Sequence, residues 1–525
     1  MKLDTIIRNA DIRTLDAARP RARDLGIWRG RIVGLDEDLD GLVATEEVDA
    51  HGATVLPGFI DSHTHLALTG QRLRSVDIGG LTDRAAALAR IAAAVTDTGA
   101  DDWIEVGGYE HSLLGSHLTA QELETAAPGR RVYVRHISGH AGVVSPAVLA
   151  QIPPSVRENP RVESGLLEEA DLAHLRSQLF PYPLDRIKEA IVAAAAAMRR
   201  EGVTMAMDAG VGLRLGGMSG VDILAYQELR DAGELPVRVQ VMPELLDLSP
   251  QQVARTDGFS RGIPWGIATG LGDDMLRVGA AKVQLDGGLM VHSAALTEDY
   301  LDGEGRGWLI EDAETFTERI VDAHTAGWQL AIHAIGDASI DVAIAALEEC
   351  ARIAPRRRFP HRIEHASVVR PDQAEALGRL GVAAVVQPCF IYNSLEEYLD
   401  MLGPQRESWM YRWRSLEAAG ARLVSSTDRP LLGSPLEGIR SLVRRTSARG
   451  TVTTPSERIG LPRAIETWTV DGAWVAGMAD RLGRLRRGYL ADLVLLDTHP
   501  ESVAPERIRD VPVVATMVDG ELQWH

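Results

Sequence analysis

The chain has 525 residues, 45% of them hydrophobic and 25% charged, which is typical of a globular protein with one large core or two smaller ones. Its 55 basic and 74 acidic residues give a net charge of -19, which disfavours binding to nucleic acid or to an anionic membrane surface. The sequence starts without a leader-like segment and has no apolar run near about 18 residues, so we expect a cytoplasmic protein without a membrane span. Cys350 and Cys389 are too few for a disulfide framework and match no zinc motif.

The two ends of the chain share a texture of short apolar runs separated by turn residues. Residues 1–57 contain DTIIRNADIRTL and DLGIWRGRIVGLD, and residues 481–525 contain ADLVLLD and PVVATMVDGELQW. Runs of this kind predict short β-strands. Because a few short strands are unstable alone, we expect residues 1–57 and 481–525 to form one composite domain of β-sandwich type.

Residues 58–480 alternate between strand-like and helix-like segments. Seven apolar runs follow residue 200: GVTMAMDAG, PVRVQVMPE, GAAKVQLDGG, GWQLAIHAIGD, HRIEHAS, GVAAVVQP and ARLVSSTD. Helix-length stretches such as DASIDVAIAALEECARIA lie between them, a pattern typical of parallel strands joined by crossover helices. With VLPGFIDSHTH in front the strands number eight, which predicts an α/β protein with a TIM barrel over residues 58–480.

One gap in this alternation is too long for a single crossover. Residues 66–200 separate the first predicted strand from GVTMAMDAG, and we interpret them as a long insertion after barrel strand 1. The insertion contains a strand-like run, RRVYVRHISGH, and an alanine-rich helix, LDRIKEAIVAAAAAMRREG. It therefore has secondary structure of its own.

Four histidines and an aspartate stand where predicted barrel strands end. His63 and His65 are two residues apart, so on an extended strand both side chains project from one face. His333, His365 and Asp428 end the runs LAIHAIGD, HRIEHAS and LVSSTD. A His-x-His pair alone is more often a hydrogen-bonded structural feature than a metal site. Because the strands of a TIM barrel end on the side of its active site, the five residues together predict a metal site there.

Lys282 lies inside the apolar run VGAAKVQLDGG, where burial favours loss of its proton. Only Lys2, Lys188 and Lys282 are lysines among the 55 basic residues, which leaves 52 arginines, so a lysine at this position is informative. A neutral amine can take up carbon dioxide as a carbamate, and this supplies a bridging carboxylate that arginine cannot form. The alternative is a structural ion pair of Lys282 with Asp286 or Glu169.

These motifs together resemble the amidohydrolase superfamily, and more narrowly amidohydrolase family 3, the group that includes N-substituted formamide deformylase. The matching stretches run through most of the chain: LPGFIDSHTHL, SGHAGVVSPAVL, SGLLEEA, GVTMAMDAG, AAKVQLDGG, AIHAIGD, HRIEHA, STDRP and DGAWVAGMADRLGRLRRGYLADLVLLD. The turn RRGYLADL departs mildly from the pattern, since relatives often have lysine there.

The resemblance implies one or two divalent metal ions. The ligands that it implies are His63, His65, Lys282, His333, His365 and Asp428. The first histidine pair would bind one ion, the later two histidines a second, and a carboxylated lysine would bridge the two ions. Asp428 would also act as the catalytic acid and base. Zinc suits imidazole and carboxylate ligands, and manganese, iron or cobalt would also fit.

Four further residues are candidates for the site. His140 resembles a pocket residue of the family, Arg414 could clamp a substrate carboxylate, and Glu169 could replace the lysine carbamate. The alternative for each of these three is a surface position. Asp337 could orient His333 through a hydrogen bond to its ring or could cap the following helix. The sequence assigns no role to His51, His111, His136 and His324.

The function that the resemblance implies is hydrolysis of a non-peptide carbon–nitrogen bond in an N-acyl amine, formamide or cyclic amide, with a metal-bound hydroxide as the nucleophile. The expected partner is a small-molecule substrate, and a homodimer is one assembly that the sequence allows. A deaminase or an esterase would use the same metal site. A third hypothesis is a catalytically silent barrel that acts as a binding protein, which the intact ligand set disfavours.

Overall fold

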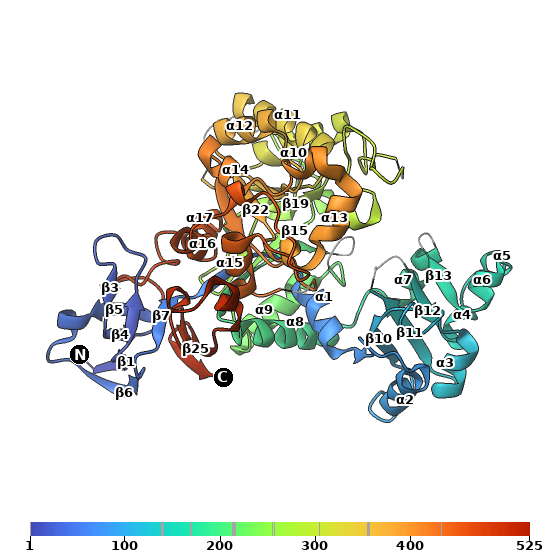
Figure 1. Ribbon diagram of the computed structural model, residues 1–525, viewed down its shortest axis with the longest axis horizontal. Coiled ribbons are helices and arrows are strands. Elements are labelled where there is room, and N and C mark those ends of the chain that lie inside the picture. The colour runs from blue at the N-terminus through green and yellow to red at the C-terminus, as the bar shows by residue number, and fades with distance from the viewer. Residues whose placement is uncertain are drawn as a thin grey trace. The chain divides into compact units, whose positions relative to one another are not determined.

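The computed structural model describes residues 2–137, 141–168, 171–212, 217–254, 256, 258–303, 305–353, 358–431 and 433–525. The chain divides into two compact units. Unit 1 comprises Met1–Ala67, Ala194–Gly217 and Val221–His525, and unit 2 comprises Leu68–Ala193 and Met218–Gly220. Strands β10 and β11 mark unit 2 in Figure 1.

Strands from both ends of the chain share one sheet of unit 1. Its order is β26-β25-β24-β7-β2-β3, and β24 pairs antiparallel with β7. A second sheet, β5-β4-β1-β6, is built from N-terminal residues alone. The strands are β1 (Lys2–Arg8), β2 (Asp11–Arg13), β3 (Arg21–Ala22), β4 (Leu25–Trp28), β5 (Arg31–Leu35), β6 (Val43–Asp49), β7 (Thr54–Pro57), β24 (Leu493–Leu496), β25 (Val513–Val518) and β26 (Glu521–Trp524).

The two sheets enclose a common hydrophobic core, which contains Ile7, Leu25, Val55, Leu493 and Met517. The pairing of the chain ends that the sequence predicts is therefore present. A separate sandwich domain of residues 1–57 and 481–525 stays a prediction, because unit 1 contains these residues together with the metal-site strands.

Each of the eight runs predicted as barrel strands is a strand in the structure, and the pairings between them are parallel. The strands are β8 (Phe59–Thr64), β14 (Val203–Val211), β15 (Arg238–Pro243), β18 (Leu276–Val278) with β19 (Ala281–Gln284), β20 (Leu330–Ala334), β21 (Arg362–His365), β22 (Ala383–Val386) and β23 (Arg422–Ser425). The helices of this part are α9 (Asp222–Ala232), α10 (Ala313–Thr325), α11 (Asp337–Ile353), α12 (Pro371–Leu380), α13 (Cys389–Glu407), α14 (Trp413–Ala419), α15 (Pro435–Arg444), α16 (Leu461–Thr467) and α17 (Val470–Val475). The short pair β16 (Ser249–Pro250) and β17 (Arg261–Gly262) forms a ladder of its own.

These parallel strands form two sheets, β18-β15-β14-β8 and β19-β20-β21-β22-β23. The fourth strand joins them, because β18 and β19 are successive parts of it, separated by Gly279 and Ala280. Small and flexible side chains such as Ala280, Ala331, Ala383 and Met207 are buried between the strands. Within the described residues no ladder joins β8 to β23, so the closed barrel stays a prediction.

Unit 2 contains a five-stranded sheet with the order β13-β12-β11-β10-β9. Its elements are β9 (Val76–Asp77), α2 (Arg84–Ala94), β10 (Trp103–Tyr109), α3 (Ala120–Ala126), β11 (Arg131–His136), β12 (Ala141–Val144), α4 (Pro146–Leu149), α5 (Pro154–Arg157), α6 (Pro160–Glu163), β13 (Leu166–Glu168) and α7 (Leu172–Leu179). The unit boundaries fall within α1 (Leu66–Arg74) and α8 (Leu184–Arg199). Most of unit 2 thus lies within the predicted insertion of residues 66–200, which extends a few residues beyond Leu68–Ala193 at each end.

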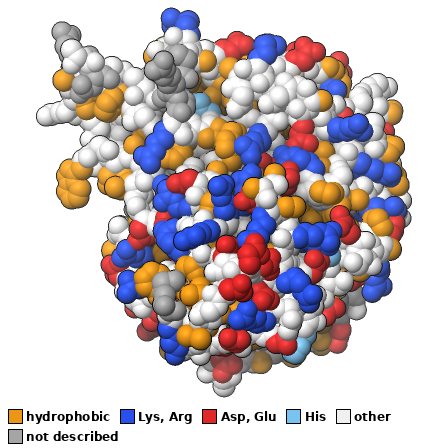
Figure 2. All heavy atoms as spheres, turned by 90° about the vertical axis from the view of Figure 1, so that its left-hand side faces the viewer, with side chains coloured by type: hydrophobic (Ala, Val, Ile, Leu, Met, Phe, Trp, Pro, Cys, Tyr) orange, Lys and Arg blue, Asp and Glu red, His pale blue; other side chains and the backbone are white. Residues whose placement is uncertain are grey.

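Charged side chains of both signs intermingle on the face shown in Figure 2. Ion pairs form on the N-terminal strands and their turns, where Arg8 pairs with Asp24 and Arg19 with Asp38, each at 2.9 Å. Among the described residues, no helix combines the length and the apolar character needed to cross a bilayer.

Candidate metal centre

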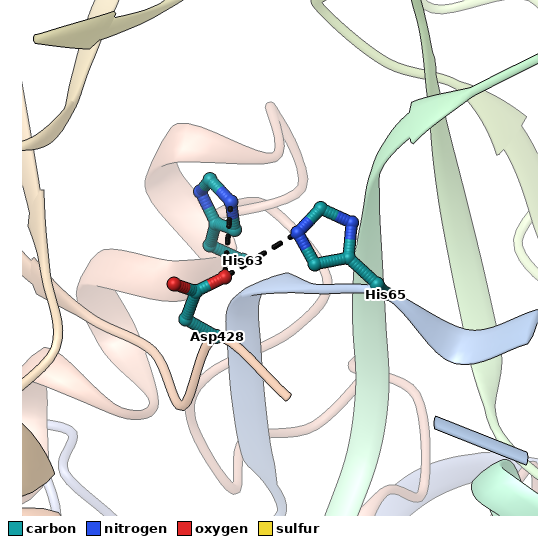
Figure 3. A group of neighbouring side chains, drawn as sticks. All are labelled: His63, His65 and Asp428. Carbon is teal, nitrogen blue, oxygen red and sulfur yellow. Dashed lines mark ion pairs between the residues drawn. The ribbon is translucent and has the colours of Figure 1, made fainter. Parts of the chain in front are cut away.

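Three side chains converge at the end of β8. His63 lies on this strand with 1% of its side chain exposed, and His65 follows the strand with 18% exposed. Asp428 Oδ1 is 3.6 Å from His63 Nε2 and 3.4 Å from His65 Nε2, so both rings face one carboxylate oxygen (Figure 3). One potential ligand atom of each residue lies within 4.8 Å of those of the other two. Two imidazoles and a carboxylate around a common point are a typical ligand set for zinc.

Backbone contacts fix Asp428 against β8. Its N–H donates to the His63 carbonyl at 2.8 Å. The N–H and hydroxyl of Thr427 donate to the carboxylate of Asp61, which lies on β8. Asp428 has a φ of 57°, which is uncommon for a residue other than glycine and is held by such contacts. The loop after β23 is thereby bound to β8, and the carboxylate is held beside the two histidines.

A buried carboxylate orients His63. Its Nδ1 donates to Glu364 Oε2, and Glu364 also accepts a hydrogen bond at 2.8 Å from Arg362 Nη2. Glu364 and Arg362 both lie on β21 and are fully buried. The nearby Arg362 guanidinium and the His63 ring outweigh burial and hold the pKa of Glu364 well below its ordinary value. The ionised carboxylate keeps the proton of His63 on Nδ1, so the lone pair of Nε2 faces the site.

His365, at the end of β21, is oriented in the same way. Its Nδ1 lies 2.9 Å from Gln387 Oε1, and Gln387 Nε2 donates to Ser426 Oγ at 3.0 Å. Because Gln387 Oε1 accepts, Nδ1 of His365 carries the proton and Nε2 is left for a ligand. The His365 ring lies 5.0 Å from that of His63.

His333, on β20, uses the opposite ring nitrogen for its protein contacts. Its Nε2 lies 3.5 Å from Asp286 Oδ1 and 3.4 Å from the Gly287 carbonyl oxygen. Its Nδ1 is therefore the nitrogen left for a metal ion. The His333 and His365 rings are 4.3 Å apart, which brings the second predicted histidine pair together.

Lys282, on β19, lies between these groups. Its Nζ is 3.4 Å from His63 Nε2, and 3% of the residue is exposed. Burial lowers the pKa of Lys282 to about 8, so more of the amine is neutral at pH 7 than for an exposed lysine. Asp286 accepts hydrogen bonds from the N–H groups of Ile335 and Gly336. Its carboxylate is thus directed at the loop after β20, which disfavours the alternative of a Lys282–Asp286 ion pair.

The imidazoles are held in the form that binds metal. Burial lowers the pKa of His63 to about 4 and that of His365 to about 3, and it also lowers the pKa of His333 well below its ordinary value. All three rings are neutral at pH 7, as coordination requires. Burial alone would raise the pKa of Asp428. The hydrogen bond to His65 and the nearby imidazoles outweigh it and hold this pKa well below its ordinary value. The centre therefore offers neutral nitrogens beside an ionised carboxylate.

A sequence model of the amidohydrolase family matches residues 46–522, which is most of the chain. The chain belongs to the amidohydrolase family. The chain is 29% identical to Protein LONG AFTER FAR-RED 3 of Arabidopsis thaliana, over 99% of this chain and 91% of that protein. N-substituted formamide deformylase of Arthrobacter pascens is 27% identical over 99% of this chain and 98% of that protein.

The fold of this amidohydrolase is shared by a solved structure, that of an uncharacterized metal-dependent hydrolase from Pyrococcus horikoshii OT3. The two have a TM-score of 0.80 and 26% sequence identity, over 96% of this chain and 99% of the other. The family membership predicted from the sequence is confirmed.

The residues of this amidohydrolase fit a divalent metal ion. His63 and His65 both turn Nε2 to the same carboxylate oxygen of Asp428. Neutral nitrogen and ionised oxygen donors together are the set that zinc binds.

Two of the remaining candidate residues, Asp337 and Arg414, lie within the part of the chain that the structure describes. The carboxylate of Asp337, at the start of α11, accepts hydrogen bonds from Thr297 and from Arg370, so it does not orient His333 as predicted, and Asp286 contacts His333 instead. Arg414 is exposed on α14, and its role as a substrate clamp stays a prediction. His140 and Glu169 lie outside the described residues.

Proposed function

We propose that this chain is a metal-dependent hydrolase of a non-peptide carbon–nitrogen bond, in an N-acyl amine, a formamide or a cyclic amide. The observation that carries the proposal is the convergence of His63, His65 and Asp428 near the ends of β8 and β23, with Lys282 of β19 beside His63. The N-substituted formamide deformylase to which the chain is similar supports this class of bond.

In the proposed centre, His63, His65 and Asp428 would hold one ion, His333 and His365 would hold a second, and Lys282, as a carbamate, would supply a further carboxylate ligand. Zinc is the proposed metal, because imidazole and carboxylate ligands suit it. When bound, such ions make water acidic enough to act as a nucleophile at neutral pH and polarise the carbonyl group of the substrate. The closed TIM barrel of this family would bring all these strand ends to one mouth.

The protein's own groups handle the proton. Asp428 is ionised, and one of its oxygens faces two ring nitrogens, so it is placed to accept a proton from the attacking water. It can then give this proton to the leaving nitrogen, because an amine leaves readily only when it is protonated. Glu364 and Gln387 keep the rings of His63 and His365 in fixed orientations during this exchange.

Metal analysis and a substrate screen together test the proposal. We expect the purified protein to hold about 1–2 equivalents of a divalent ion per chain, as the ligand count indicates. Chelation should abolish hydrolysis of a panel of N-formyl amines, N-acyl amines and cyclic imides, and restoring zinc should restore it. Full activity in metal-free protein would refute the mechanism. Turnover of esters or of amino-heterocycles alone, with no amide turned over, would show that the metal site serves another reaction.

A further inference from the structure

Three partly buried histidines lie together in unit 2, and none of them belongs to the set described above. His111 follows β10, His117 lies in the loop before α3, and His136 ends β11. Strands β10 and β11 lie side by side (Figure 1) and pair in parallel, with Tyr109 opposite His136. We call His111, His117 and His136 the unit 2 histidine cluster.

The rings of the cluster are in direct contact. His111 Nδ1 is 3.0 Å from His136 Nε2, and the rings of His111 and His117 stack with their centres 4.2 Å apart. The ring centres of His117 and His136 are 6.1 Å apart. His117 Nδ1 lies 3.0 Å from the hydroxyl of Tyr109, which leaves Nε2 of this ring for another partner.

The loop that carries His117 is fixed by charged and backbone contacts. Arg84 Nη2 donates to the His117 carbonyl at 2.7 Å and also binds Glu122, and Glu122 caps α3 together with Thr119. The N–H of Leu118 donates to the Tyr109 hydroxyl at 3.0 Å. A site built on a fixed loop loses little conformational entropy when it binds an ion.

Two rings of the cluster are shifted towards the neutral form. Burial and the nearby histidines lower the pKa of His117 and of His136. The carboxylate of Glu168 partly offsets this by raising the pKa of both rings, and that of Glu110 raises the pKa of His136. A ring in the neutral form can bind a cation without first losing a proton.

We propose that His111 and His136, with His117 as a third ligand, bind a transition-metal ion of the imidazole-preferring class, such as Zn²⁺ or Cu²⁺. Two nitrogens about 2.0 Å from one ion at a tetrahedral angle lie roughly 3.3 Å apart, close to the separation of His111 Nδ1 and His136 Nε2. His117 joins them by a side-chain rotation that unstacks its ring from His111. The site does not depend on the proposed function, since its ligands lie in unit 2 and the proposed catalytic ligands in unit 1.

The test removes the four unit 1 histidines of the proposed catalytic centre and counts the metal that remains. The full chain with His63→Ala, His65→Ala, His333→Ala and His365→Ala is titrated with Cu²⁺, and bound copper is measured by equilibrium dialysis and by electron paramagnetic resonance. We expect one equivalent with nitrogen coupling in the spectrum. Loss of an outer contact to a metal ligand already costs roughly 10–100-fold in affinity, so His111→Gln with His136→Gln in this background should weaken binding by at least about 100-fold.

His174→Gln is the matched control, because it removes an imidazole from α7 of the same unit. The proposal is overturned if the background protein binds no copper, if the cluster variant binds as much as the background, or if the control loses the same equivalent. Circular dichroism checks that the variants are folded. If the double variant does not fold, His136→Gln alone is expected to lose the nitrogen coupling and at least about 10-fold in affinity, and unchanged binding there would refute the site.

Discussion

Glu364 accepts a hydrogen bond from Nδ1 of His63, a residue 301 positions away in the chain. The contact joins β21 to β8, and Arg362, which is also fully buried, donates to the same carboxylate. The carboxylate engages Nδ1 of His63, whereas Nε2 of this ring faces Asp428. Its effect on chemistry is therefore exerted through the orientation and basicity of one ring.

Glu364→Gln tests this positioning role. The amide keeps the shape of the side chain but loses the charge that favours the Nδ1–H form of His63, so metal affinity should fall by roughly 10–100-fold and activity at limiting metal should fall with it. Dialysis against a metal buffer measures the affinity. Excess metal should restore much of the rate. Glu457→Gln is the control, since Glu457 is also buried but binds Ser415. Equal loss of metal in both variants would indicate general destabilisation instead.

Lys282→Arg and Lys282→Ala test the carbamate. Arginine keeps a cation but forms no carbamate, so both variants should lose most of their metal and activity while staying folded. The alanine variant leaves a gap that formate or acetate can fill, and we expect partial recovery of activity with these acids. Lys188→Arg, on α8, is the matched control. A Lys282→Arg protein that keeps its metal and rate would point to another bridge, with Glu169 the first candidate.

Glu122→Gln tests the pH dependence of the loop that carries His117. The Arg84 hydrogen bonds lower the pKa of Glu122 to about 2. Since this folded-state pKa lies below its ordinary value, the carboxylate stabilises α3 above about pH 4.5, and the effect is lost as the pH falls towards 2. At pH 7 the variant should destabilise α3 by about 1 kcal/mol. Hydrogen exchange of peptides covering Ala120–Ala126 measures this, and a difference that persists undiminished near pH 2 would contradict it.

Arg414→Ala tests the predicted substrate clamp. If Arg414 binds a substrate carboxylate, the variant should raise KM for acidic substrates by at least about 10-fold and leave neutral ones unchanged, since a charged hydrogen bond contributes roughly 1.5–3 kcal/mol. Arg379→Ala, at an exposed position of α12, is the control. Because Arg414 is exposed on α14, unchanged kinetics with both substrate classes would assign it to the surface.

The strands of unit 1 could be predicted from the sequence because each is a short apolar run with a polar residue at its end. His63 and Lys282 could be predicted because position on a strand determines which way a side chain points, and His65 and Asp428 because they follow the ends of β8 and β23. Parallel strands then bring their ends to one edge. These relationships depend on local pattern and strand order alone.

The hydrogen-bond partners of the proposed metal ligands could not be predicted in this way. Asp337 follows His333 by four residues, but α11 begins at Asp337 and directs its carboxylate to Thr297 and Arg370. Asp286 reaches His333 instead, because it accepts hydrogen bonds from the backbone of the loop after β20. Glu364 stood in the motif HRIEHAS without a role, since only the packing of β21 against β8 shows which ring it meets.

The antiparallel pairing of β24 with β7 has a consequence for biosynthesis. Strand β7 ends at Pro57, two residues before β8 begins, and one of its two neighbours is Leu493–Leu496. All the proposed ligands have left the ribosome before that neighbour is made, because the last of them is Asp428. Strand β7, which leads into β8, therefore lacks one of its two neighbours until translation is nearly complete. A chain truncated before residue 493 would contain every proposed ligand but would lack β24, the strand that pairs with β7.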